Sequence, residues 1–154
     1  MTDNDKIENQ VGLVFQHVAR LRTRYFDQQL AKHGLTSAQV YAINYLLRED
    51  GLTQVELSRL LGIGTVAVSG LVDRLESNGW VARKPDPRDR RSNRIWLTDK
   101  VSEKVGNMQD AAQAVNEASF AGMTPEEAEA LVKGLRRVRD NLKSATCDEG
   151  DAPI

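Results

Sequence analysis

The sequence predicts a mainly α-helical fold that carries one small β-hairpin. Three observations support this: capping patterns mark several helix starts, apolar residues recur at helical spacing, and two short strand-like runs flank one proline- and arginine-rich stretch. With 154 residues, 40% of them hydrophobic, the chain is large enough to bury a core. We therefore expect one domain over residues 1–154.

The first two helices are predicted at residues 5–32 and from Thr36 to about Asp50. Thr36 and Gln39 form a capping pattern at the start of the second helix. Apolar residues of the first helix alternate at spacings of four and three, which gives a heptad-like seam. The seam consists of Ile7, Val11, Val14, Val18, Leu21 and Tyr25.

Residues 53–78 are typical of two short helices joined by a glycine turn. Thr53 and Glu56 form a capping box at the start, and Gly62 supplies the left-handed backbone that ends the first helix. The second helix runs from about Thr65 to Asn78. Its predicted buried stripe is Val68, Leu71, Val72 and Leu75. Its opposite face is small and polar, which suits the major groove of DNA.

A basic hairpin is predicted directly after this helical pair. Its strand-like runs are Trp80–Lys84 and Arg94–Thr98, and only Asp86 and Asp89 oppose its cations. The cations are Arg83, Lys84, Arg88, Arg90, Arg91 and Arg94. Such a tip can follow phosphates or enter a narrow minor groove. The fold expected for residues 53–98 is therefore a winged helix–turn–helix that reads DNA.

Individual DNA contacts are predicted on the second helix of the pair and on the hairpin, here called the wing. The candidates are Thr65, Val66, Ser69, Gly70, Arg74, Arg88, Arg90 and Arg91. Val66 offers only an apolar contact, such as with a thymine methyl, and Arg74 can reach a guanine or the backbone. Asp73 would repel phosphate unless paired, so we predict that it orients the wing by holding an arginine, Arg91 being favoured. With so few long donors, groove shape and half-site spacing should supply much of the specificity for an A/T-rich operator.

Two further helices are expected at residues 99–146, and the second of them begins at the capping pattern Thr124-Pro125-Glu126-Glu127. Their apolar seams are Val101, Val105, Met108, Ala112 and Val115, then Ala128, Leu131, Leu135, Val138 and Leu142. The seams either close the core of one chain or, as we favour, join residues 5–32 in a dimerisation domain. Dimeric readers and near-palindromic operators occur together.

Charge and composition narrow the function. The net charge is −1, yet residues 53–100 hold nine Lys/Arg against six Asp/Glu, so basic surface is confined to the DNA-reading region. Residues 1–10 lack signal-peptide features and no apolar run could span a membrane, so we expect a cytoplasmic protein. His17 and His33 are not spaced as metal ligands, and the glycines of GIGTVAVSG lack the GK[ST] of a phosphate loop. We expect no enzyme, no catalytic or metal site and no cofactor.

Several segments resemble the MarR family of winged-helix regulators over nearly the whole chain. They are LTSAQ at 35–39, LSRLLGI at 57–63, LVDRLESNGWV at 71–81, DPRDRR at 86–91 and LTD at 97–99. The resemblance implies a homodimeric bacterial transcription factor, often a repressor, that a small ligand releases from its operator.

The resemblance also implies an effector crevice between the dimer helices and the reading region. The implied ligand residues are Arg20, Arg24, Tyr41 and Asn44, which suit a small aromatic or anionic effector. An equally open alternative is that they are surface and packing residues. Some relatives sense peroxide through a cysteine in the first helix, but the single cysteine here is Cys147, whose acidic neighbours should raise its thiol pKa. A redox switch is therefore not expected, and residues 147–154 should fray.

A second class of function stays open from the sequence. The same wing arginines could dock an acidic protein, which would make the chain a winged-helix protein-interaction module. The two classes differ in their expected salt dependence, because phosphate contacts release condensed counterions.

Overall fold

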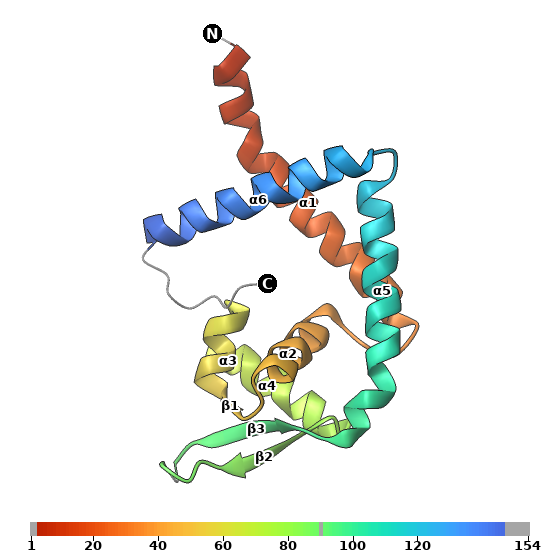
Figure 1. The fold of residues 1–154 in the computed structure, drawn as a ribbon. Helices are drawn as coiled ribbons and strands as arrows, with labels where there is room; N and C mark the ends of the chain where they lie inside the picture. Colours follow the sequence, from red (N-terminus) through yellow and green to blue (C-terminus); the bar gives the residue numbers. More distant parts are fainter. Residues whose placement is uncertain (1–2, 90, 147–154) are drawn as a thin grey trace.

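The computed structural model describes residues 3–89 and 91–146, and it shows two groups of elements (Figure 1). The helices α2 (Ser37–Arg48), α3 (Gln54–Leu61) and α4 (Thr65–Ser77) lie with a small sheet at one end. The long helices α1 (Asp3–Ala31), α5 (Ser102–Phe120) and α6 (Pro125–Thr146) form the other, and the short 3-10 helix η1 (Asp99–Val101) leads into α5. The mainly helical fold with a wing is confirmed. The expectations for Arg90, Cys147 and the tail, and for the side chain of Ile7, fall outside the described residues.

Capping boxes set the starts of α2, α3 and α6, as the sequence predicts. At α3, the Thr53 hydroxyl accepts the Glu56 N–H at 3.2 Å, and a Glu56 carboxylate oxygen accepts the Thr53 N–H at 2.7 Å. Thr36 and Gln39 make the same reciprocal pair at α2, and so do Thr124 and Glu127 at α6. Gly62 ends α3 with a φ of 66°, a left-handed conformation that glycine adopts without strain.

The sheet has three antiparallel strands in the order β1-β3-β2. Strands β2 (Val81–Pro85) and β3 (Asn93–Leu97) form the predicted wing, with Val81 opposite Leu97. Strand β1 (Leu52–Thr53) was not predicted, because two residues are too few to show an alternating pattern. Strand β1 pairs with β3 through Leu52 and Ile95, so the start of α3 is fixed to the wing.

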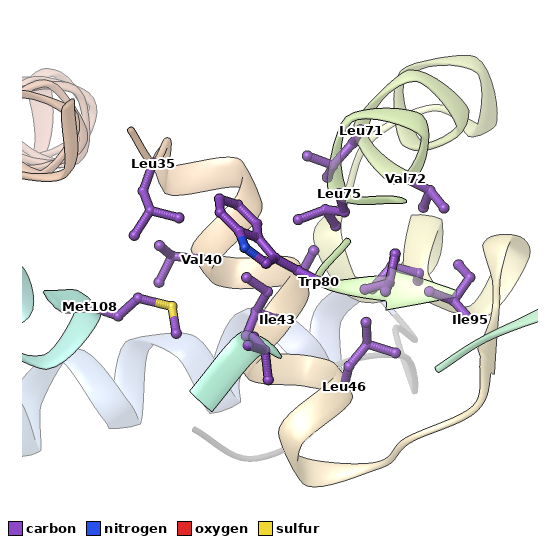
Figure 2. Close-up of a cluster of buried hydrophobic side chains, with 14 of the residues drawn as sticks. Leu35, Val40, Ile43, Leu46, Leu71, Val72, Leu75, Trp80, Ile95 and Met108 are labelled. Atoms are coloured by element: carbon purple, nitrogen blue, oxygen red, sulfur yellow. The ribbon is translucent and has the colours of Figure 1, made fainter. Parts of the chain in front are cut away.

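The core lies between α2, α3, α4, the sheet and α5. Figure 2 shows Ile43 and Leu46 of α2, Leu75 of α4, Ile95 of β3 and Met108 of α5 in one apolar cluster. All four residues of the predicted α4 stripe are buried, at 1% exposure or less. This packing holds the opposite face of α4 toward solvent.

The three apolar seams differ in what covers them within the chain. Val101, Met108 and Val115 of that seam are buried within one chain, because α5 packs against the core and α1. The seam residues of α1 from Val11 to Tyr25 remain exposed, and no described residue of α6 is buried. The faces of α1 and α6, but not that of α5, are thus left without a partner in the described chain.

Among the described residues, no single helix is long and apolar enough to cross a membrane. The helices α3 and α4 meet the length and composition requirement only as a pair, and they are bent by 108° at their junction.

Candidate nucleic-acid interface and effector cavity

The outward face of α4 collects five of the predicted contact residues on one helix. Thr65, Val66 and Arg74 are exposed, and Ser69 and Gly70 are half-buried. Val66 is 86% exposed, the highest value among the exposed large apolar side chains of the described residues. The face is therefore free to meet another surface, although its contact with DNA stays a prediction.

An ion-pair cluster joins α4 to the base of the wing. Arg83 of β2 donates from Nη2 to Oδ1 of Asp73 at 2.6 Å, and its guanidinium also pairs with Glu76. The backbone N–H of Arg83 donates to Glu76 at 3.1 Å, and this bond, followed by the Arg83 side chain, holds the pKa of Glu76 below its usual value. The cluster thus fixes the wing to α4 within the chain.

The prediction that Asp73 pairs with Arg91 was therefore wrong, because its partner is Arg83. The prediction that this partner is an arginine of the wing was right. Arg83 lies three residues after Trp80, where the chain leaves α4, so β2 runs beside that helix. Arg91 lies near the far end of the hairpin, where its backbone N–H donates to Asp89 at 2.9 Å. Distance along the hairpin decides which arginine reaches α4.

A second cluster fixes the wing to the turn between α2 and β1. The buried carboxylate of Asp86 accepts Nε of Arg94 at 2.8 Å and the backbone N–H of Arg88 at 2.9 Å. The Arg88 N–H is the largest cause that lowers the pKa of Asp86, and Arg94 adds to it. Nη1 of Arg94 donates to the carbonyl of Gly51 at 2.8 Å. No local pattern in the sequence separates Arg94 from the other wing cations.

The described wing cations therefore divide into three groups. Arg83 and Arg94 are held in ion pairs with acids of this chain. Arg88 and Arg91 are exposed and make no ion pair within the described residues, while the Lys84 ammonium lies 5.5 Å from the centre of the Trp96 ring. Arg88 and Arg91 are the wing arginines that can turn toward phosphates.

A cavity of about 310 Å³ lies between α1, α2 and α5. Tyr41 and Asn44 line it, as expected, but Arg20 and Arg24 do not. These two arginines lie on another face of α1, and Arg22 lines the cavity instead. A helix turns about 100° per residue, so residues two positions apart point to nearly opposite sides.

The cavity combines apolar walls with one cation and several amides. The Arg22 guanidinium donates to Asn116 at 3.1 Å and to the Ser119 hydroxyl, both on α5. The rings of Phe26 and Tyr41 lie 5.9 Å apart at 49°. Aromatic walls with a few polar groups are typical of small-molecule sites. Arg22 makes no ion pair within the described residues, so its charge is available to an anion.

Comparisons with known proteins agree with this geometry. Residues 33–92 match the profile of the MarR family. The HTH-type transcriptional regulator TtmR of Methylorubrum extorquens is 31% identical over 140 residues, covering 91% of this chain and 71% of that protein. The HTH-type transcriptional repressor NicR of Pseudomonas putida is 27% identical over 139 residues, covering 90% and 88%.

Two solved structures share the fold. A MarR transcriptional regulator from Methanosarcina mazei superposes with a TM-score of 0.81 at 26% identity, covering 89% of this chain and 99% of that one. Bordetella bronchiseptica BpsR, whose DNA binding is regulated by 6-hydroxynicotinic acid, gives a TM-score of 0.74 at 27% identity, covering 85% and 94%.

Proposed function

The chain belongs to the MarR family of transcriptional regulators, and on that premise we propose that it is a homodimeric repressor whose binding to a near-palindromic operator responds to a small ligand. The observation that carries DNA binding is the free face of α4 beside a wing that Arg83 fixes to the same helix. In this arrangement α4 enters the major groove while Arg88 and Arg91 meet the flanking backbone or minor groove. The protein acts in the cytoplasm, where the chromosome lies, and it is not an enzyme.

Dimer formation is supported by the uncovered apolar faces of α1 and α6. Leu135 and Leu142 of α6 are 42% and 59% exposed, and Val14 and Val18 of α1 are 56% and 49% exposed. Side chains of both helices also line one shallow hollow, among them Phe15 of α1 and Leu135 and Val138 of α6. Contiguous apolar surface of this kind marks an interface, and a second copy would bury it.

Ligand response is supported by the cavity between α1, α2 and α5. The proposed effector is a small aromatic acid, whose ring would lie near Phe26 and Tyr41 and whose carboxylate would meet Arg22. Asn44 can supply a further hydrogen bond. Repression is supported by the likeness to NicR, and regulation by an aromatic acid by the likeness to BpsR.

Selection of bound fragments from random DNA, followed by sequencing, tests the proposal. We expect a near-palindromic, A/T-rich site, in which moving the half-sites by half a helical turn harms binding more than most single-base changes. The affinity should fall log-linearly with salt, with a slope of roughly −0.9 per neutralised phosphate. Failure to enrich any DNA, together with capture of an acidic protein by the wing, would instead favour the interaction-module alternative.

A further inference from the structure

Gly70 lies inside α4, where glycine weakens a helix because its backbone is so free in the unfolded chain. Within the described residues nothing requires glycine there. A Cβ added at this position would meet only Nη1 of Arg74, at 3.8 Å, which is an ordinary contact. Its φ is not among the positive values that favour glycine. Gly12, Gly106 and Gly134 also have room for a Cβ within their helices, so free space alone does not set Gly70 apart. Its position does, because it lies on the outward face of α4 between Val66 and Arg74.

Val66, Gly70 and Arg74 follow one another at intervals of four residues, so they share one stripe of the helix surface. Helical side chains lean back toward the N-terminus, and a side chain therefore covers the turn before its own Cα. The guanidinium of Arg74 accordingly lies over Gly70, as the 3.8 Å approach shows. A side chain longer than a Cβ at position 70 would lean toward Val66 in the same way, and in the present chain Val66 is 86% exposed.

The stripe thus presents an apolar group and a charged donor side by side. An isopropyl group suits the C5 methyl of thymine, whereas a guanidinium suits O6 and N7 of guanine. Arg74, unlike Arg83, makes no ion pair within the described residues, so its donors are free. The guanidinium of Arg74 lies over Gly70, which is one helical turn, or about 5.4 Å, from Val66. Base pairs rise by about 3.4 Å, so the two groups would meet bases one or two steps apart.

We propose that Gly70 is a specificity-determining residue of the operator contact. Because Gly70 has no side chain, Val66 and Arg74 can act as one reading unit. In each half-site they contact a T·A pair and a G·C pair that lie one or two steps apart. This inference rests on the proposed function, since it requires α4 to lie in the major groove.

Modified operators test the unit at the level of single atoms. In the duplex recovered by selection, each thymine is replaced in turn by uracil, which removes the methyl group, and each guanine by 7-deazaguanine, which removes N7. We expect one thymine and one guanine, within two base pairs, at which the affinity falls about three- to tenfold. Val66→Ala should lose the sensitivity to uracil alone, and Arg74→Ala the sensitivity to 7-deazaguanine alone.

Gly70→Ala tests the role of the missing side chain. We expect Tm to rise by about 1–4 °C, because alanine stabilises a helix, while the operator affinity falls about tenfold and both base sensitivities disappear. Gly106→Ala on α5 is the matched control, since a Cβ there meets nothing within 4 Å and one at Gly70 makes only an ordinary contact. The control should raise Tm without changing the operator affinity.

Two results would overturn the inference while leaving the proposed function intact. One is wild-type operator affinity in Gly70→Ala, and the other is an operator in which neither base modification matters although the salt slope is normal. If the wild-type protein enriched no DNA at all, the proposed function would fall and this inference with it.

Discussion

Arg83 on the first wing strand reaches back to Asp73 on α4, with Nη2 2.6 Å from Oδ1. The acid is 62% exposed and the arginine only 19%, so the pair lies at the edge of the interface between helix and hairpin. An exposed pair of this kind contributes less than about 1 kcal/mol to folding stability. Its larger effect is geometric, because it fixes the angle between two elements that, under the proposed function, contact one DNA molecule together.

A double-mutant cycle on this pair should show coupling in operator affinity. Asp73→Asn and Arg83→Gln should each weaken binding several-fold, and the double variant should lose little more than either single one, because both changes release the same hairpin. Binding is measured by fluorescence anisotropy on a labelled operator. The cycle of Asp73→Asn with Arg91→Gln serves as the control and should be additive. Additive losses in the Arg83 cycle would reject the positioning role.

The wing tip should contribute through charge. Arg91→Ala, alone and combined with Arg90→Ala, is expected to weaken operator binding, with the salt slope falling by about 1 for each phosphate that is no longer neutralised. Circular dichroism and sedimentation should show unchanged helix content and association state. Unchanged binding of the double variant at physiological salt would contradict a role of the tip in DNA binding.

The effector cavity predicts a contrast between neighbouring arginines. Arg22→Gln should abolish the effect of an aromatic acid on operator binding, because it removes the arginine that lines the cavity. Arg20→Gln removes the same charge from another face of α1 and should respond like the wild type. The probes are benzoate and 6-hydroxynicotinic acid, titrated into the preformed DNA complex. Equal responses of the two variants would show that the cavity does not hold the carboxylate.

The uncovered face of α6 predicts a dimer that one acid can weaken. Leu135→Glu should raise the dimer dissociation constant at least tenfold, because it places a charge in an apolar interface. Lys133→Glu, which changes charge at an exposed residue off the seam, is the matched control. Analytical ultracentrifugation over a concentration series measures both. A variant Leu135→Glu that sediments like the wild type would remove α6 from the interface.

Acid should destabilise the fold through the α3 capping box. The Thr53 backbone N–H is the largest cause that lowers the pKa of Glu56 from its ordinary 4.5. A carboxyl whose pKa is lower in the folded chain stabilises it above the unfolded pKa and loses this effect as pH falls through the folded value. The free energy of unfolding should thus decrease as the pH drops below about 4.5. The decrease should be less steep in Glu56→Gln, which keeps the cap without the titrating group. Identical slopes between pH 5 and 3 would contradict this contribution.

Local signals in the sequence predicted most of the fold, whereas pairings between segments far apart in the sequence could not be predicted from it. The capping boxes of α2, α3 and α6 depend on residues three apart, so the sequence alone reveals them. The partner of Asp73 depends on which wing residue the hairpin register brings to α4, and no local pattern fixes that. Arg22 was missed for a related reason: arginines and apolar residues occur all around α1, and only its contact with α5 decides which face meets the cavity.

The internal ion pairs of the wing also influence how the protein would search a genome. Arg83 and Arg94 are neutralised by acids of the same chain, so they add little to the sequence-independent pull of DNA phosphate. A genome offers about 10⁶–10⁹ competing sites, and occupancy of an operator depends on the ratio between its affinity and theirs. Under the proposed function, a wing whose arginines are paired internally would raise that ratio by lowering the affinity for non-operator DNA, so that the protein dissociates from such sites sooner.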